Sequence, residues 1–339
     1  MAYFDSVKLE KGMYHTPKKS FSQVLEELDP SQQYENSELE GLDAFQRQLR
    51  RFDIKVSGEN SDIVDRFFQS SESASLFPEY VSRAVAQGMG RVNQLQNLVA
   101  TVSYIDAMDY RTISVSTPST AKAPAAASAV GEGEPLPQTT ISNQKSLVSL
   151  KKHGRLLAAS FEALRFHKLD LFTVTLRQIG ADIARDLLAD AVDVLLNGDG
   201  NDNAVTPTTL AAKPVYADFV DLWSSLAPFQ LNTVLASTDT MKDLLTIPEF
   251  KDPLAGMNFQ GSGKLITPLG ANLVHTSCLA DRTILALDKN CALEMVQAGN
   301  VILDYDKLID RQLERAAISS IAGFARIFPD AVKAVSYAA

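Results

Sequence analysis

Residues 117–140 read TPSTAKAPAAASAVGEGEPLPQTT, and this stretch constrains the possible folds more than any other part of the chain. It consists mainly of Ala, Ser, Thr, Pro and Gly, with three charged residues, Lys122, Glu132 and Glu134. Such a composition buries too little apolar surface to order itself, and a structureless loop of this length is uncommon inside a compact domain. The stretch is therefore either a disordered linker or an extended hairpin that a neighbouring molecule orders.

The flanking sequences favour the hairpin. Residues 99–116, VATVSYIDAMDYRTISVS, and residues 145–160, KSLVSLKKHGRLLAAS, are rich in β-branched and aromatic or alternating apolar residues. Both patterns predict strands, so two strands bracket the stretch. A long two-stranded projection is marginally stable by itself and needs a partner to lie on.

Two helices are expected to end at glycines. Apolar residues recur at steps of three and four over residues 169–196, which predicts a helix about 40 Å long that ends at Gly198. A shorter helix is expected to begin with Pro78 in its first turn and to end at Gly88 and Gly90. The long helix exceeds what a compact core of this size usually requires.

The sequence after the long helix, NGDGNDN, raises the question of a calcium loop. Asp199, Asn201 and Asn203 fit the first, third and fifth ligand positions of such a loop. The glycine required at position six is Ala204, and the bidentate glutamate required at position twelve is Leu210. The motif therefore predicts a turn that ends the helix through local hydrogen bonds rather than a metal site.

The N-terminal region combines irregular and helical sequence. Residues 1–36 are polar and contain prolines, so they are expected to be irregular. The following residues predict a helix with a capping box formed by Ser37 and Glu40. Its basic residues lie off the apolar stripe and are expected on a solvated or subunit-contacting face; they are Arg47, Arg50 and Arg51.

Residues 57–78 are too apolar for a free linker and too irregular for a core element. They contain Phe67, Phe68 and Phe77 without a sustained period. We interpret this region as an arm that docks its aromatic side chains onto another surface.

From residue 215 onward, short helices and strands alternate. The pattern ends in several strands, as in TILALD, CALEMVQ and RAAISSIAGFARIF, and contains no internal repeat. The chain is therefore expected to be α+β or mixed α/β rather than a repeating βαβ series.

Composition narrows the function classes. Apolar residues make up 45% and charged residues 22% of the chain, as in soluble globular proteins. No stretch approaches the ~20 apolar residues that span a bilayer, and the start lacks a signal-peptide pattern, so residence in a cytoplasm is expected. The net charge of −9 argues against a protein that grips nucleic acid, whereas enclosing nucleic acid needs no basic groove. The two cysteines, Cys278 and Cys291, are expected to be reduced and buried.

No catalytic, cofactor-binding or metal-binding motif is found. The four histidines lack metal-ligand spacing, no GxSxG sequence occurs, and GEGEPLP has no lysine–serine/threonine pair for a phosphate loop. Glu132 and Glu134 lie two residues apart in an exposed loop, which does not create a desolvated acid/base pair. The sequence thus predicts a protein that is not an enzyme.

The order of these parts resembles the major capsid proteins of tailed bacteriophages. An arm, a strand leading into an extended loop, a returning strand, one long helix with a glycine–aspartate turn and a mixed α/β region follow each other over residues 60–335. The matching stretches are LFPEYVSRAVAQG (76–88), GEGEPLPQTTIS (131–142), KSLVSLKKHGRLLAASFEALRF (145–166), LLNGDG (195–200) and GFARIFPDAVKAV (323–335).

The resemblance implies an α+β, Hong Kong 97-like capsid fold with an N-terminal arm, an extended loop, a peripheral domain with a long spine helix, and an axial domain. The implied boundaries are 1–90 for the arm, 112–144 for the loop, 91–111 with 145–200 and 301–328 for the peripheral domain including the spine helix 168–197, and 201–300 with 329–339 for the axial domain.

It further implies a structural protein that self-assembles as hexamers and pentamers into an icosahedral head enclosing double-stranded DNA, without sequence-specific binding. The implied partners are further copies of itself, a portal, and a scaffold, maturation protease or decoration protein, but no membrane. Localisation in the virion follows, with assembly in the host cytoplasm. An encapsulin-like nanocompartment shell is the alternative within the same fold, and an enzyme or metal-dependent binding protein is the alternative outside it.

The residues expected at inter-subunit contacts lie in the loop and the arm: Phe67, Phe68, Phe77, Lys122, Glu132 and Glu134. Some members of the resembled family cross-link a loop lysine to an asparagine of a neighbouring subunit. Lys122 is the only lysine in this loop, but RQLERAAISSIAGFARIF near the end of the chain contains no asparagine. Covalent cross-linking is therefore not expected, and non-covalent contacts are.

Overall fold

The computed structural model describes residues 4–16, 19–92, 94–107, 109–116, 130–133, 139–160, 167–251, 267, 269–299, 301–308 and 313–338. The chain divides into two compact units, which are described separately. Unit 1 comprises 1–92, 154–184 and 301–320, and unit 2 comprises 93–153, 185–300 and 321–339. None of the helices in the described residues is long and apolar enough to cross a membrane.

Unit 1 is mostly helical. Its helices are α1 (Phe21–Leu28), α2 (Ala44–Arg51), α3 (Ser71–Ala74), α4 (Phe77–Arg91) and the first part of α6 (Leu169–Asn197), with 3-10 turns at Phe4–Ser6, Lys11–His15, Ser31–Tyr34 and Val64–Gln69. The bounds of α6 confirm the long helix expected from the apolar period.

The N-terminal part of unit 1 differs from the sequence-based expectation. Residues 21–28 are helical, because Ser20 and Gln23 form a reciprocal capping box at the start of α1. The capping box expected at Ser37 is wrong, since α2 begins after Asp43, which caps the helix together with Gln46. A carboxylate or hydroxyl followed three residues later by a glutamine satisfies the free N–H groups of a first helical turn in the same way as Ser and Glu.

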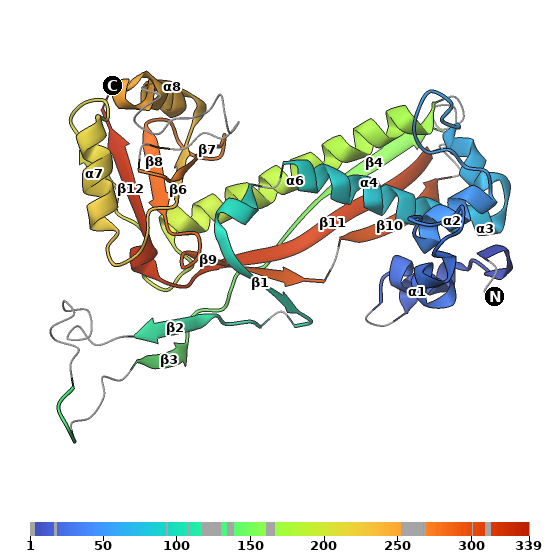
Figure 1. The fold of residues 1–339 in the computed structure, drawn as a ribbon, viewed down its shortest axis with the longest axis horizontal. Coiled ribbons are helices and arrows are strands. Elements are labelled where there is room, and N and C mark those ends of the chain that lie inside the picture. The colour runs from blue at the N-terminus through green and yellow to red at the C-terminus, as the bar shows by residue number, and fades with distance from the viewer. Residues whose placement is uncertain are drawn as a thin grey trace. The chain divides into compact units, whose positions relative to one another are not determined.

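The expected end of α4 at its glycines is also wrong. The helix continues to Arg91, and Figure 1 shows it lying along α6. A Cβ atom at Gly88 would lie 2.0 Å from the carbonyl oxygen of Arg177, and one at Gly180 would lie 2.1 Å from that of Val85. These glycines therefore permit the two helix backbones to approach each other, and they do not terminate a helix.

The strands of unit 1 belong to one sheet, in which β10 and β11 are antiparallel. Strand β10 (Ile302–Leu308) pairs with the first part of β11 (Leu313–Arg326), from Ile302 opposite Ser319 to Leu308 opposite Leu313. Strand β4 (Lys151–Ser160) also pairs with β11. The strands expected in residues 145–160 and near the end of the chain are thus present.

Unit 2 contains two sheet regions and a separate ribbon. In the first, β1 (Val99–Ile105) runs parallel to β9 (Leu293–Ala298), and β9 pairs antiparallel with the last part of β11. The second has the order β5-β12-β8-β6-β7, with bounds Thr208–Leu210, Val332–Tyr337, Thr283–Leu287, Thr233–Ala236 and Asn272–His275. The predicted α+β character is therefore confirmed.

The second sheet carries the main apolar core of unit 2. Helices α7 (Tyr216–Ser225) and α8 (Thr238–Thr246) lie beside this sheet (Figure 1), and α9 (Pro248–Lys251) follows. Phe219 and Leu222 of α7 and Leu244 of α8 are buried in this core together with residues of β6, β7 and β8. The periodicity of the sequence predicted these elements, because the buried positions recur at helical or strand spacing.

The two cysteines of unit 2 differ partly from expectation. Cys278 and Cys291 are both free, but each is only partly buried. Desolvation by burial raises the pKa of the Cys291 thiol, and the charge of Asp288 raises it further.

A short ribbon stands apart from both sheets. Among the strands of the described residues, β2 (Ile113–Ser116) and β3 (Thr140–Asn143) pair only with each other (Figure 1). They are antiparallel, with Val115 opposite Ile141. The described strands on the two sides of the Ala-, Ser- and Pro-rich stretch thus pair with each other in antiparallel register.

Candidate assembly site at the root of the loop

The NGDGNDN turn is built around the carboxylate of Asp199. Its Oδ1 accepts hydrogen bonds from the side-chain amides of Asn201 (2.9 Å) and Asn203 (2.8 Å), and its Oδ2 accepts one from the backbone N–H of Arg326 (2.9 Å). The backbone N–H of Asp199 donates to Oδ1 of Asn203 at 3.1 Å. Gly198 adopts a φ of 82°, which a residue with a side chain rarely adopts. The predicted turn at the end of the long helix is confirmed.

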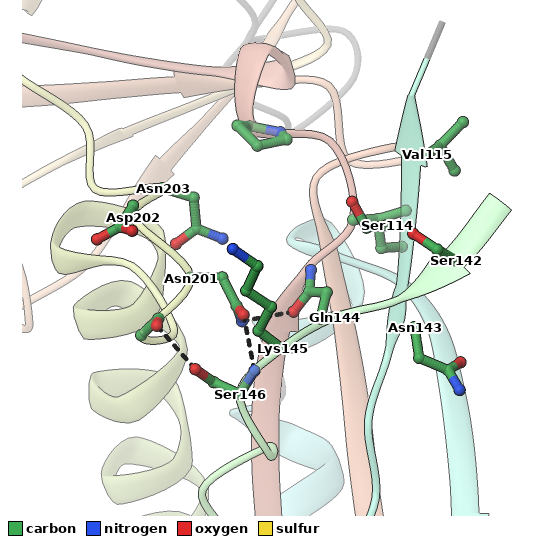
Figure 2. Close-up of a pocket in the computed structure, with 13 residues that line it drawn as sticks. Ser114, Val115, Ser142, Asn143, Gln144, Lys145, Ser146, Asn201, Asp202 and Asn203 are labelled. Carbon is green, nitrogen blue, oxygen red and sulfur yellow. Dashed lines mark hydrogen bonds between the residues drawn. The ribbon is translucent and has the colours of Figure 1, made fainter. Parts of the chain in front are cut away.

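The turn also holds the chain that returns from the ribbon. Asn201 donates to the side-chain oxygen of Gln144 at 2.7 Å and accepts from the backbone N–H of Ser146 at 2.9 Å, while the Ser146 hydroxyl donates to the carbonyl of Gly200 at 2.8 Å. Figure 2 shows these side chains converging between the turn and the ribbon. We call residues 109–112 and 144–150, which lead into and out of the ribbon, the loop root.

Arg326 lies beneath this arrangement. It is 1% exposed and donates to the carbonyl oxygens of Asn203 and Pro329, while its own carbonyl accepts from the Gln144 side chain at 2.8 Å. Desolvation lowers the pKa of Arg326, and the charges of Asp199 and Asp330 oppose that effect. A buried cation thus ties the end of β11 to the turn after α6.

A pocket of about 410 Å³ lies between the turn and the ribbon. Its lining is mainly polar and includes Ser114 and Ser142 of the ribbon, Lys145 of the root, and Asn201 and Asp202 of the turn (Figure 2). Hydroxyl and amide groups of this kind form hydrogen bonds. Within the described residues, no group of three or more His, Cys, Asp or Glu side chains is placed to hold a metal ion.

The histidine nearest to this region also has a structural partner. Nε2 of His153 on β4 lies 2.5 Å from Oδ2 of Asp190 on α6, and Nζ of Lys151 lies 2.9 Å from Oδ1 of the same carboxylate. The hydrogen bond to Asp190 raises the pKa of Lys151. These contacts fasten β4 to α6 within unit 2.

The ribbon has one apolar and one polar face. Alternation along the strands, with Val115 opposite Ile141, places Ile113, Val115 and Ile141 on the same face. Ile113 is 44% and Ile141 66% exposed. Ser114 and Ser142 occupy the other face and line the pocket. On this face Ile113 and Ile141 are thus exposed, whereas Val115 is half-buried.

The predicted contact residues of the arm lie in a cluster of aromatic rings in unit 1. Phe67 and Phe77 are 0% and 3% exposed, with ring centroids 5.6 Å apart, and Phe67 also lies 5.3 Å from the ring of Tyr80. Phe68 is half-buried, and its ring lies 5.1 Å from that of Phe77. The rings of Phe67 and Phe77 thus have almost no surface left for a neighbour, because they pack on their own chain.

The predicted loop residues are placed only in part. Glu132 is exposed. Lys122 and Glu134 lie outside the described residues. Sequence reasoning missed Gln144 and Ser146 of the loop root and Arg326 at the end of β11, which carry no motif and meet only through the fold.

Solved structures define the class to which this fold belongs. It is similar to the virus-like particle from Pyrococcus furiosus, with 11% identity, 76% of this chain and 98% of that chain covered and a TM-score of 0.50. It is also similar to the capsid of a native GTA particle (14% identity, 73% and 90% covered, TM-score 0.52) and of an empty GTA particle (16%, 73% and 90%, 0.50). At these identities the similarity establishes a capsid fold.

The sequence comparison narrows this class. Residues 143–305 match the family model described as Phage capsid protein, a segment that includes β4, α6 and most of unit 2. Comparison with curated proteins found no match. The family-model match and the similarity to these solved structures confirm the expected α+β capsid fold.

Proposed function

We propose that this chain is the major capsid protein of a tailed phage. It self-assembles as hexamers and pentamers into an icosahedral head that encloses double-stranded DNA. The observation that carries the proposal is the ribbon of β2 and β3. Hydrogen bonds hold its root, while Ile113 and Ile141 on its apolar face are exposed. A two-stranded ribbon is marginal by itself, so a firmly rooted one with an apolar face fits a contact with another molecule.

A second copy of the chain is the proposed occupant of that face. Full burial of an isoleucine side chain contributes roughly 1.5–3 kcal/mol, so Ile113 and Ile141 alone supply a substantial part of a weak contact. In a closed shell every copy both offers and receives such a ribbon. Many weak contacts then add up, which lets subunits correct errors before the shell closes.

The contact residues of the loop and the arm follow from the same proposal. Glu132 is exposed at the described end of the loop, and Lys122 and Glu134 remain proposed contact residues. For the arm, Phe68 retains exposed surface, whereas Phe67 and Phe77 support it from within unit 1. The grouping of the chain into an arm, loop, peripheral domain and axial domain is likewise part of the proposal.

The proposed partners outside the shell are a portal and a scaffold, maturation protease or decoration protein. The net charge of −9 suits a subunit that encloses DNA without sequence-specific binding and leaves packaging to a motor. The proposed location is the virion, with assembly in the host cytoplasm.

The virus-like particle from Pyrococcus furiosus shares the fold and supports a second candidate, an encapsulin-like nanocompartment shell. The two candidates differ in what the shell contains. Particles from the native source that hold DNA support the phage head, and particles that hold a protein cargo support the compartment.

Electron microscopy of the expressed protein tests the shared proposal, with closed shells or capsomer rings expected. Ile141→Asp should give a folded subunit that does not assemble, because the charge would be buried at the contact. Thr140→Asp is the matched control on the opposite face of the same strand and should assemble. Deletion of residues 117–134 should likewise leave a folded subunit that assembles poorly. A wild-type chain that stays monomeric at high concentration contradicts the proposal.

A further inference from the structure

The segment that leads into the ribbon is held by one buried carboxylate. Glu294 lies on β9 and is 5% exposed. Its Oε1 accepts from the hydroxyls of Ser103 (2.5 Å) and Tyr110 (2.7 Å), and its Oε2 accepts from the hydroxyl of Thr112. Ser103 belongs to β1, whereas Tyr110 and Thr112 belong to the loop root.

Burying the Glu294 carboxylate costs free energy of desolvation. A buried carboxylate is destabilising unless hydrogen bonds replace its lost hydration. Hydrogen bonds to an ionised acceptor are short and about twice as strong as neutral ones, and they are directional. Burial raises the pKa of Tyr110, and its hydrogen bond to Glu294 raises it further, as expected for a phenol that remains a donor. An apolar side chain would fill the same space but would not orient the root.

Fixing Tyr110 and Thr112 also fixes the returning segment. The backbone N–H of Gln144 donates to the carbonyl of Thr112 at 2.9 Å, and that of Val148 donates to the carbonyl of Tyr110 at 2.9 Å. The returning segment in turn lies against β11 at Gly323, where a Cβ atom would be 2.6 Å from the carbonyl oxygen of Ser149. The two segments of the root therefore contact the sheet at Glu294 of β9 and at Gly323 of β11.

We propose that Glu294 is a positioning residue that sets the direction in which the loop leaves the sheet, and that association between copies of the chain depends on it. The second half of this proposal rests on the proposed function of the loop at a subunit contact. The first half concerns the isolated subunit alone.

Hydrogen exchange and assembly, measured on the same full-length variants, test the two halves separately. Glu294→Met removes both acceptors at similar volume, and Glu294→Gln keeps one acceptor oxygen. We expect exchange of the Gln144 and Val148 amides to become about tenfold faster in Glu294→Met and less so in Glu294→Gln, while amides of β8 and β12 are unchanged. The concentration at which shells form should rise by about tenfold in the same order.

Tyr110→Phe and Thr112→Val each remove one donor and should reproduce part of the effect without altering Glu294. Unchanged exchange at Gln144 and Val148 in Glu294→Met overturns the positioning role. Faster exchange throughout unit 2 overturns it as well, since that result indicates general destabilisation. Faster exchange at the root with an unchanged assembly concentration overturns the dependence of association on Glu294. A wild-type chain that never assembles refutes the proposed function, and the exchange data still decide the role of Glu294 in the subunit.

Discussion

The N-terminal lobe, residues 19–52, and the loop root are both held by buried polar groups, but the chemistry differs. In the lobe, Arg47 and Asp29 form an ion pair at 2.7 Å, with side chains 0% and 1% exposed. The root relies on single hydrogen bonds spread over several residues: Asn201 donates to Gln144, and hydroxyls of the root donate to the buried carboxylate of Glu294, which has no cation as partner among these contacts. A buried ion pair fails as a whole when one partner is lost, whereas a distributed network loses one bond at a time.

The lobe concentrates its polar contacts on few side chains. Besides the ion pair, Arg47 donates to the carbonyls of Leu42 (2.5 Å) and Asp29 (2.5 Å) and to the Ser31 hydroxyl (3.0 Å), and its guanidinium lies 4.4 Å from the centre of the Tyr34 ring. The expectation that Arg47 lies on a solvated face is therefore wrong. Its charge is buried because Asp29 and three oxygen acceptors compensate it.

A second arginine fastens the lobe to α4. Arg83 donates to Glu79 (2.8 Å), to Asp43 at the start of α2 (2.5 Å) and to Ser22 of α1 (2.5 Å), and it lies 4.4 Å from the centre of the Phe45 ring. The Arg83 side chain thus contacts both α1 and the start of α2. The comparison predicts that single substitutions in the lobe have larger effects than single substitutions in the root.

The largest effect is expected for Arg47→Met, which leaves the buried carboxylate of Asp29 without its cation. Removing one partner of a buried pair costs roughly 3–5 kcal/mol, so the lobe should unfold at markedly lower urea concentration. Exchange of the α1 and α2 amides measures this directly. Arg50→Ala is the control, because the side chains of Arg50 and Glu38 are 52% and 91% exposed and their pair should contribute less than about 1 kcal/mol. Equal effects of the two substitutions would contradict the comparison.

The next effect separates the lobe from the helices beside it. Gly88→Ala introduces a methyl group 2.0 Å from the carbonyl oxygen of Arg177, so α4 and α6 must move apart at a cost of up to about 3 kcal/mol. Gly90→Ala in the same helix meets no atom within 4 Å and should stabilise the protein by about 0.5–1 kcal/mol. Thermal unfolding of both variants checks that Gly88→Ala lowers and Gly90→Ala raises the stability. A loss of stability in both variants would contradict the assignment of the difference to the close contact at Gly88.

A smaller loss of stability is expected from Asp199→Asn in the turn that holds the loop root. The amide retains one acceptor but turns N–H donors toward the backbone N–H of Arg326, at a cost of about 2 kcal/mol. Asp202→Asn is the control: Asp202 is exposed with a φ of 56°, which asparagine tolerates well. Chelators should leave both variants and the wild type unchanged, because the described oxygens of Asp199 bond to protein N–H groups. A chelator-induced loss of stability would reopen the calcium interpretation.

The sequence predicted those features that depend on local pattern. Apolar periodicity located α6, α7 and α8 and the strands of the closing region, because each buries one regular face. The turn at Asp199 was predicted for the same reason, since glycines and short polar side chains favour it locally. The antiparallel ribbon at the loop was predicted only in part: strand patterns were recognised in residues 99–116 and 145–160, but β2 pairs with β3 (Thr140–Asn143), and β4 of the second pattern pairs with β11.

Features that depend on distant partners were missed. Glu294 meets Tyr110 and Thr112 only through the pairing of β9 with β1, and Gln144 meets Arg326 only at the end of β11. Nothing near these residues in the sequence indicates the contact. The lobe was missed for a related reason, because the amphipathic pattern placed Arg47 on an outer face and could not anticipate that Asp29 would neutralise it.

The smallest expected effect is the pH dependence of the stability that Glu26 contributes to the lobe. Burial opposes ionisation of Glu26, but hydrogen bonds from the Ser31 side chain and backbone, a hydrogen bond from the Ala44 N–H and the charge of Arg47 outweigh it and lower the pKa of Glu26. A carboxyl with a lowered pKa in the folded state stabilises that state above its unfolded pKa, and this contribution disappears as the pH falls through the folded pKa.

The advantage of the wild type over Glu26→Gln should therefore shrink on acidification from neutral pH, by less than about 1 kcal/mol because the side chain is 42% exposed. Exchange of the α1 amides as a function of pH measures it, with Glu27→Gln on the exposed side of the same helix as the control. If the difference in stability between Glu26→Gln and the wild type is the same at all pH values, Glu26 stabilises the lobe through its packing and not through its charge. The contrast between the lobe and the loop root would then rest on the ion pairs of Arg47 with Asp29 and of Arg83 with Asp43 and Glu79.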